Sequence, residues 1–427
     1  MAFPEEDAKC FEGLLDFHEW EVEQYGRQKL FSRHKLFVAE DAMDLFSNHA
    51  QTHVAEVMEQ CRGMYLALKG WIEERLPRCD HRVLLKHLLT AAKLHDICMG
   101  PSEEMMQCLT LADRMYEKVI SGGGVAAESV LLEQAAEKAG LSGSKRLKLI
   151  GILSRSAAPG QEARKKLGDA LAAFHDESKR FVRKNHAPLG ALFVLDHAEA
   201  VKKSYGKETD IAMVASLVML HSTSSGDCRV VGYDNESARS DTARCIDATL
   251  RRRGWERPQD ERWLKTTATL AAILRLADTR RSGRRIRTID DVKLEYRVTG
   301  DGAELYMERN GYAERISKRQ THDILVAECC TEFGEIRAEK NGGEWEIIHR
   351  LEVSDWQNEE IWNLFRQSRL ATYIKEIMTA ELSVKNGIKH RIIVRLLGGN
   401  EQRKKNIIMH KSWCEEGIFI EIDEKEC

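Results

Sequence analysis

The sequence contains few prolines, no CxxC motif and no apolar run long enough to cross a bilayer. Only 6 of the 427 residues are proline, which favours long helices over loop-rich structure. The 11 cysteines form no CxxC pair and are odd in number, so we predict neither a zinc knuckle nor a disulfide framework. A transmembrane helix needs about 20 apolar residues in succession. We therefore expect no membrane-spanning segment.

A strong excess of charge of either sign is also lacking. The formal net charge is −3, so the overall balance does not indicate a nucleic-acid-binding protein. The first residues, MAFPEEDAKC, are acidic where an export signal would be basic. We expect a cytoplasmic protein with reduced cysteines.

Helical periodicity dominates the first two thirds of the chain. Val83 to Leu94 and Thr266 to Ala277 are apolar runs with helical spacing. We predict a helical domain over residues 1–288, in which 102–175 is a helical insert between two core segments. Those segments are 45–101 and 176–288.

Alternation typical of strands begins near residue 289. DDVKLEYRVTGDGAELYMERNG predicts a hairpin around GDG, and EKNGGEWEIIHRLEV predicts strand around NGG. HRIIVRLLGG and EGIFIEI are expected strands, whereas HDILVAECCTEFGEIRAEK and NEEIWNLFRQSRLATYIKEIMTAEL are expected helices. The fold class we predict is mainly α, with a smaller α+β domain at 289–427.

Several of the predicted helices carry an imidazole or a carboxylate at one end. These residues are His53, His95 with Asp96, His186 (after a helix start expected at Asn185), His221 and Asp278. A buried carboxylate without a partner is costly, so Asp278 predicts a metal ion or an arginine beside it. Imidazole nitrogen and carboxylate oxygen together suit divalent metal ions. Each residue alone is more often an ordinary core or surface residue, and only the set indicates a site.

Taken in order, five segments resemble the ligand-bearing helices of the HD-domain metal-dependent phosphohydrolases. They are HAQTHVAEV, LTAAKLHDICM, VRKNHAPLGA, ASLVMLHS and AAILRLADTRRSGRRI. The resemblance covers roughly residues 45–290, interrupted by the insert, and implies an HD-type helical bundle. The last segment and the strands after it are also similar to the C-terminal region of exopolyphosphatase and guanosine-pentaphosphate phosphohydrolase proteins. Arg280 and Arg281 stand where many members carry a second acidic residue.

The resemblance implies a binuclear site that binds two divalent ions (Mn, Fe, Zn, Mg, Ni or Co). His53, His95, Asp96 and Asp278 would hold the first ion, and Asp96 would bridge to a second held by His186 and His221. It leaves open whether His49 replaces His53.

The implied reaction is hydrolysis of a phosphoester of a nucleotide or related phosphorylated substrate, by a hydroxide that the metals activate. Asp96 is the central catalytic candidate, and Lys93, Arg183 and Arg275 are candidate phosphate contacts. Other functions stay open: a mixed-valence di-iron oxygenase of the HD fold, a nucleotide-sensing or partner-binding module, or a single-strand nuclease. A homo-oligomer is compatible with all of them.

Overall fold

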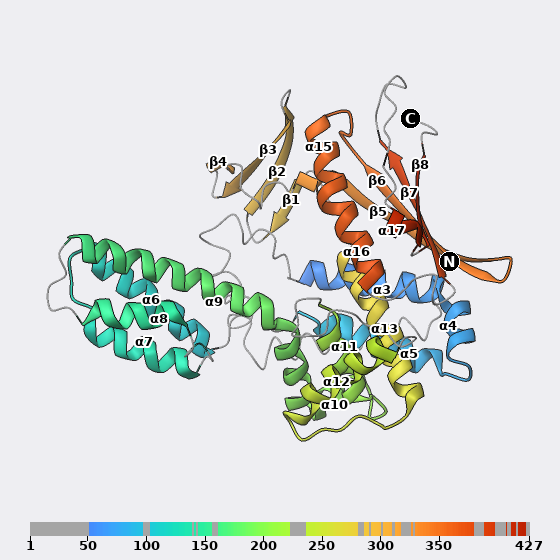
Figure 1. Cartoon of the computed structure of the whole chain (residues 1–427), viewed down its shortest axis with the longest axis horizontal. Coiled ribbons are helices and arrows are strands. Elements are labelled where there is room, and N and C mark those ends of the chain that lie inside the picture. Colours follow the sequence, from blue (N-terminus) through green and yellow to red (C-terminus); the bar gives the residue numbers. More distant parts are fainter. Residues whose placement is uncertain are drawn as a thin grey trace. The chain divides into compact units, whose positions relative to one another are not determined.

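The computed structural model is mainly helical and has a smaller α+β part, as the sequence predicts (Figure 1). It describes residues 51–96, 103–138, 141, 144–155, 161–222, 236–280, 286–289, 292–299, 302–309, 312–316, 326–327, 329–379, 388–397, 407, 411–415 and 417–423. These residues fall into two compact units. The first holds those between Asp41 and Asp96 and between Ala187 and Cys427, and the second holds those between Ile97 and His186.

The first unit is built on helices whose apolar faces pack together. They are α3 (Gln51–Ala67), α4 (Lys69–Arg75), α5 (His81–Leu94), α10 (Ala198–Tyr205), α11 (Ile211–Leu220), α12 (Glu236–Arg251) and α13 (Glu261–Thr279). Helices α5, α11 and α13 pack on one another, and α3 packs against α5 and α13. Every residue of α11 is buried, so this helix lies at the centre of the unit.

Aspartates start the three central helices. The side chains of Asp80, Asp210 and Asp260 accept backbone N–H groups at the starts of α5, α11 and α13. Asp210 also accepts a hydrogen bond from Trp263 Nε1 at 2.6 Å, and its own N–H donates to His87 Nε2 at 3.0 Å. One residue therefore ties the start of α11 to both neighbouring helices.

The second unit consists of helices around an apolar core. They are α6 (Glu103–Ile120), α7 (Ala126–Lys138), α8 (Lys145–Ser154) and the part of α9 (Gln161–Asp196) that ends at His186. Met115, Leu132, Leu167 and Phe174 are among its buried residues. The helical character predicted for the insert is confirmed. The helix start expected at Asn185 is wrong, because α9 is already helical from Gln161.

Two four-stranded sheets follow α13 in the first unit. The first is antiparallel, with order β1-β2-β3-β4 and strands β1 (Ile286–Ile289), β2 (Val292–Thr299), β3 (Gly302–Arg309) and β4 (Tyr312–Ile316). The second has order β5-β6-β7-β8, with strands β5 (Thr331–Asn341), β6 (Glu344–Val353), β7 (Ile388–Leu396) and β8 (Ile418–Asp423). β5 and β6 pair antiparallel, and the other pairs are parallel.

Helices make the crossovers between the parallel strands. α15 (Glu359–Leu364), the π-helical turn η2 (Phe365–Leu370) and α16 (Ala371–Thr379) join β6 to β7, and α17 (Lys411–Glu415) lies between β7 and β8. The hairpins predicted around GDG and NGG are confirmed as β2–β3 and β5–β6. The helix expected across HDILVAECCTEFGEIRAEK is wrong from Thr331 onward, where the chain pairs with β6 as strand β5.

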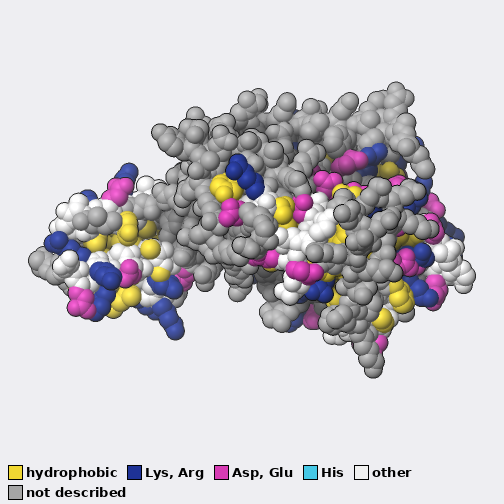
Figure 2. Space-filling model, turned by 90° about the horizontal axis from the view of Figure 1, so that it is seen from above, with side chains coloured by type: hydrophobic (Ala, Val, Ile, Leu, Met, Phe, Trp, Pro, Cys, Tyr) yellow, Lys and Arg dark blue, Asp and Glu magenta, His cyan; other side chains and the backbone are white. Residues whose placement is uncertain are grey.

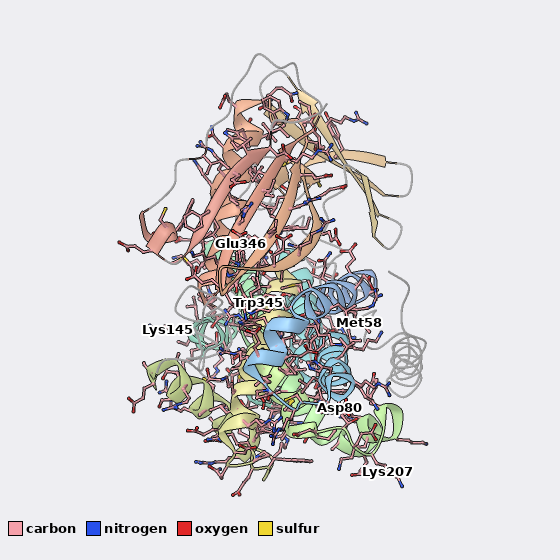
Figure 3. All side chains as sticks on the ribbon, turned by 90° about the vertical axis from the view of Figure 1, so that its right-hand side faces the viewer. Met58, Asp80, Lys145, Lys207, Trp345 and Glu346 are labelled. Carbon is pink, nitrogen blue, oxygen red and sulfur yellow. The ribbon has the colours of Figure 1, made fainter. Side chains whose placement is uncertain are left out.

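The hairpin between β5 and β6 rests on α4, as Figure 3 shows around Trp345. Trp345 Nε1 donates to Glu74 Oε2 at 3.0 Å, and Lys340 Nζ donates to Glu74 Oε1 at 2.6 Å. A Cβ on Gly70 would come within 2.7 Å of the Trp345 ring, so the close approach requires glycine there. One compact unit thus joins residues on both sides of the domain boundary that we expected at residue 289.

The described surface carries charges of both signs. Figure 2 shows lysine and arginine side chains interspersed with aspartate and glutamate, and small hydrophobic patches lie between them. Among the described helices, none combines the length and the apolar character that crossing a membrane requires.

Replacing Asp210 with alanine should lower the free energy of unfolding by about 2–3 kcal/mol, because the change removes a helix cap and the acceptor of Trp263. Asp80→Ala is the matched control, since it removes only an exposed cap and should cost about 1 kcal/mol. Urea unfolding followed by circular dichroism measures both losses. Equal losses would contradict the linking role of Asp210.

Acid should destabilise the first unit through His87. Burial lowers the pKa of His87 from its ordinary 6.5, and Lys86 lowers it further, although Asp210 and Glu208 oppose the shift. The unfolded chain then binds more protons than the folded chain below pH 6.5, so stability decreases as the pH falls from there. His87→Gln should flatten this decrease in unfolding experiments between about pH 7 and 5. An unchanged pH dependence of stability in this variant would contradict the assigned role of His87.

Candidate metal centre

His95 ends helix α5 in a helical backbone conformation, with φ −59° and ψ −38°. Its Nδ1 donates to the carbonyl oxygen of Ala92 at 2.7 Å. A carbonyl can only accept, so Nδ1 carries the hydrogen, and the neutral ring has its lone pair on Nε2. The His95 side chain is completely buried. Because Nδ1 is occupied by the hydrogen bond to its own helix, Nε2 is the nitrogen that is able to bind a metal.

His221 repeats this arrangement at the end of α11. Its φ is −67° and its ψ −25°, and its Nδ1 donates to the carbonyl oxygen of Val218 at 2.6 Å. The His95 and His221 rings meet edge to face, with their centroids 4.9 Å apart. Two helices thus present the same buried ligand nitrogen to one place.

Asp96 lies between the two imidazoles. Its Oδ2 is 3.1 Å from His95 Nε2, and its Oδ1 is 3.5 Å from His221 Nε2. One ligand atom from each of these three buried residues lies within 4.8 Å of the others. A single carboxylate therefore directs one oxygen toward each histidine. We refer to His95, Asp96 and His221 as the His-Asp cluster.

Asp278 approaches the cluster from the last turn of α13. Its Oδ1 is 3.6 Å from His95 Nε2, and its side chain is about one-fifth exposed. Burial by itself lowers the pKa of His95, but the charges and hydrogen bonds of Asp96 and Asp278 outweigh it and raise that pKa to about 10. Two carboxylates around one buried imidazole therefore favour a positive charge at this place.

The donor set of the His-Asp cluster fits a divalent metal ion. Imidazole nitrogen with carboxylate oxygen suits zinc, manganese, iron, cobalt and nickel. Histidines that bind metals typically donate their other N–H to a carbonyl or carboxylate, as His95 and His221 do here. The carbonyl-rich ends of α5 and α11 also favour a cation. Two bound ions stay a prediction.

Three further predicted ligands or contacts are placed less fully. His53 lies in α3 and Arg183 in α9, but their side chains are outside the described residues. His186 is buried in α9, and it is the last residue of the second unit, whereas the His-Asp cluster belongs to the first. The roles of these three residues at the cluster stay predictions.

Lys93 and Arg275 are both buried, in different surroundings. Lys93 lies on α5 one turn before Asp96. Arg275 Nη2 donates to Glu376 Oε2 at 3.1 Å and to Thr379 Oγ1 at 3.2 Å, both on α16. Its described contacts are therefore a core ion pair, and a phosphate contact by Arg275 stays a prediction.

The sequence does not single out Arg280, because it opens a run of basic residues typical of a solvated turn. It is instead among the largest completely buried side chains in the described structure. Its partner Tyr373 is distant in the sequence, so no local pattern pointed to the pair. The one feature of the sequence that points to burial of Arg280 is its position directly after a buried apolar helix.

A groove of about 820 Å³ runs between α3 and β5. Glu59 and Gly63 line one side, and Phe333 and Glu339 line the other. No member of the His-Asp cluster is among its lining residues, so it is separate from the candidate metal centre.

Comparisons of the chain with protein-family models, curated proteins and solved structures found no match in any of the three. What the protein does is therefore inferred from its own residues.

Purified wild-type protein should retain a bound transition metal, and His95→Ala and His221→Ala should lose it, because each removes a buried ligand nitrogen. His197→Ala is the matched control. His197 also donates Nδ1–H to a backbone carbonyl four residues earlier, at 2.9 Å, but its ring stacks on Phe193 and it is not a member of the cluster. Elemental analysis of the three variants measures the difference. Equal metal content in all of them would contradict the assignment.

Proposed function

We propose that this protein is a metal-dependent phosphohydrolase acting on a nucleotide or related phosphorylated substrate. The observation that carries the proposal is the buried Asp96 carboxylate, whose two oxygens lie near the Nε2 atoms of His95 and His221. Charges are rarely buried together unless a cation or a hydrogen-bond network compensates them. A metal ion offers that compensation and also a chemical use for the site.

The chain's own residues would divide the work in the following way. His95 and His221 turn Nε2 toward Asp96, because the Ala92 and Val218 carbonyls accept from the opposite nitrogens. A metal ion held there would bind the Nε2 lone pairs. Asp96 supplies two oxygens in different directions, which suits a bridging carboxylate. A divalent ion bound there would act as a Lewis acid on a phosphoryl oxygen and lower the pKa of water.

The reaction class draws on two further features. Five segments ending in histidine or aspartate follow one another in the order of the HD-domain phosphohydrolases, and three of them supply His95, Asp96, His221 and Asp278 to this place. Lys93 lies one turn before Asp96 on α5, and its ammonium group would be a suitable contact for a phosphate. Both features favour a phosphoester over an uncharged substrate.

Wild-type protein supplied with Mn²⁺, Fe²⁺, Co²⁺ or Zn²⁺ should release phosphate or a nucleotide from at least one phosphoester. Asp96→Asn should reduce the rate about 100-fold or more, because the amide has the same shape but cannot bind a metal as a carboxylate does. A screen of mononucleotides, cyclic dinucleotides and oligonucleotides, followed by chromatography, measures turnover, with His197→Ala as the control.

Three results, from that screen, a nucleotide-binding measurement and an oxygen-consumption assay, would change the proposal. Metal-loaded protein without turnover on any of these substrates would contradict phosphohydrolysis. Tight nucleotide binding without turnover would support a sensing module. Oxygen consumption that depends on iron would support the oxidative alternative.

A further inference from the structure

Helix α16 holds the last turn of α13 on both sides of Asp278. Before Asp278, the completely buried Arg275 donates to Glu376 at 3.1 Å and to Thr379 at 3.2 Å. After it, Arg280 Nη1 donates to the hydroxyl of Tyr373 at 2.9 Å. The two arginines lie three residues before and two residues after the aspartate that approaches His95.

The contacts on α16 share one side of that helix. Tyr373, Glu376 and Thr379 are spaced three residues apart, which places successive members on neighbouring positions of a helical surface. One surface of one helix therefore reaches both arginines. A shift of the α13 end would break hydrogen bonds on both sides of Asp278.

Arg280 is held by more than α16. Its Nε donates to Gln60 Oε1 of α3 at 2.9 Å, and its Nη2 donates to the carbonyl oxygen of Gly334 in β5. Its guanidinium also lies over the Phe333 ring, 4.9 Å from the centroid. The side chain is 1% exposed, and its hydrogen-bond partners Gln60, Tyr373 and the Gly334 carbonyl are all neutral. Such a buried cation is costly unless each contact is well formed.

The hydrogen bonds continue from Tyr373 into the β5–β8 sheet, called the mixed sheet because it has antiparallel and parallel pairs. Arginine can only donate, so the Tyr373 oxygen accepts from Arg280. The same hydroxyl shares a hydrogen bond with His349 Nδ1 at 2.8 Å, and His349 Nε2 shares one with His390 Nδ1 at 2.8 Å. Burial, with the charges of His390 and Arg280, holds the pKa of His349 well below its usual value. A continuous series of hydrogen bonds therefore runs from α13 through α16 to β6 and β7.

We propose that Arg280, anchored by Tyr373, is a positioning residue that fixes the Asp278 carboxylate beside His95, so that the mixed sheet and its α16 crossover set the geometry of the metal centre. This inference rests on the proposed metal binding. The described hydrogen bonds of Arg280 go to Gln60, Tyr373 and Gly334, not to the His-Asp cluster, so Arg280 acts through the backbone of α13.

The test is a titration of the full-length chain with Co²⁺, which reports both the dissociation constant and the visible absorption of the bound ion. Tyr373→Phe keeps the ring and removes only the hydroxyl that Arg280 and His349 share. It should weaken Co²⁺ binding about tenfold or more and alter the absorption bands. Glu376→Gln tests the Arg275 side independently and keeps the test decisive if Tyr373→Phe does not fold.

Two comparisons separate positioning from a general loss of stability. Ile377→Val removes a buried methyl group from the same helix and should leave the Co²⁺ spectrum and affinity unchanged. In an Asp278→Asn background, Tyr373→Phe should change the affinity by less than about twofold, because its effect passes through Asp278. An undiminished effect in that background, or unchanged Co²⁺ binding in folded Tyr373→Phe, would overturn the inference. Wild-type protein that binds no Co²⁺ would instead overturn the proposed metal centre.

Discussion

The first unit is organised around one constraint, which is the burial of two imidazoles and a carboxylate where helices end. Such burial is costly unless each polar atom has a partner. His95 and His221 meet this constraint by donating Nδ1–H to a carbonyl of their own helix, which leaves Nε2 turned toward Asp96. The arrangement requires the ends of α5 and α11 to converge, and it explains why these helices pack closely on each other and on α13.

The positions of these helix ends could be predicted from the sequence. An apolar run that stops at a polar residue marks both the helix and its end, and His95, His221 and Asp278 each follow such a run. The partners that complete the core could not be predicted in the same way. Glu376 lies 101 residues from Arg275, and pairing over that distance leaves no local pattern.

Wrong predictions arose where local composition and long-range pairing disagree. Residues after Thr331 are rich in glutamate, lysine and arginine, which suit a helix, yet they form β5 because β6 pairs with them. Asn185 resembles a helix cap but lies inside α9. The two units divide at His186 and Ala187, just before Pro188, where the helix lacks one backbone hydrogen bond. Asparagine is only a preferred residue at helix starts, so Asn185 alone does not show that a helix begins there. Proline always lacks a backbone N–H, so Pro188 weakens the helix inside which it lies.

The chain changes from helices to sheets after α13. Arg280 caps the end of α13, and Asp278 lies two residues before it. A buried guanidinium with neutral partners gains little net stability over an apolar side chain, so its value lies in specificity. Each of its bonds reaches a different element, namely α3, α16 and β5. Losing one partner would leave a buried cation poorly compensated, which favours joint assembly of these three elements. Under the proposed positioning role, folding of the β5–β8 sheet and placement of the Asp278 carboxylate would then be coupled.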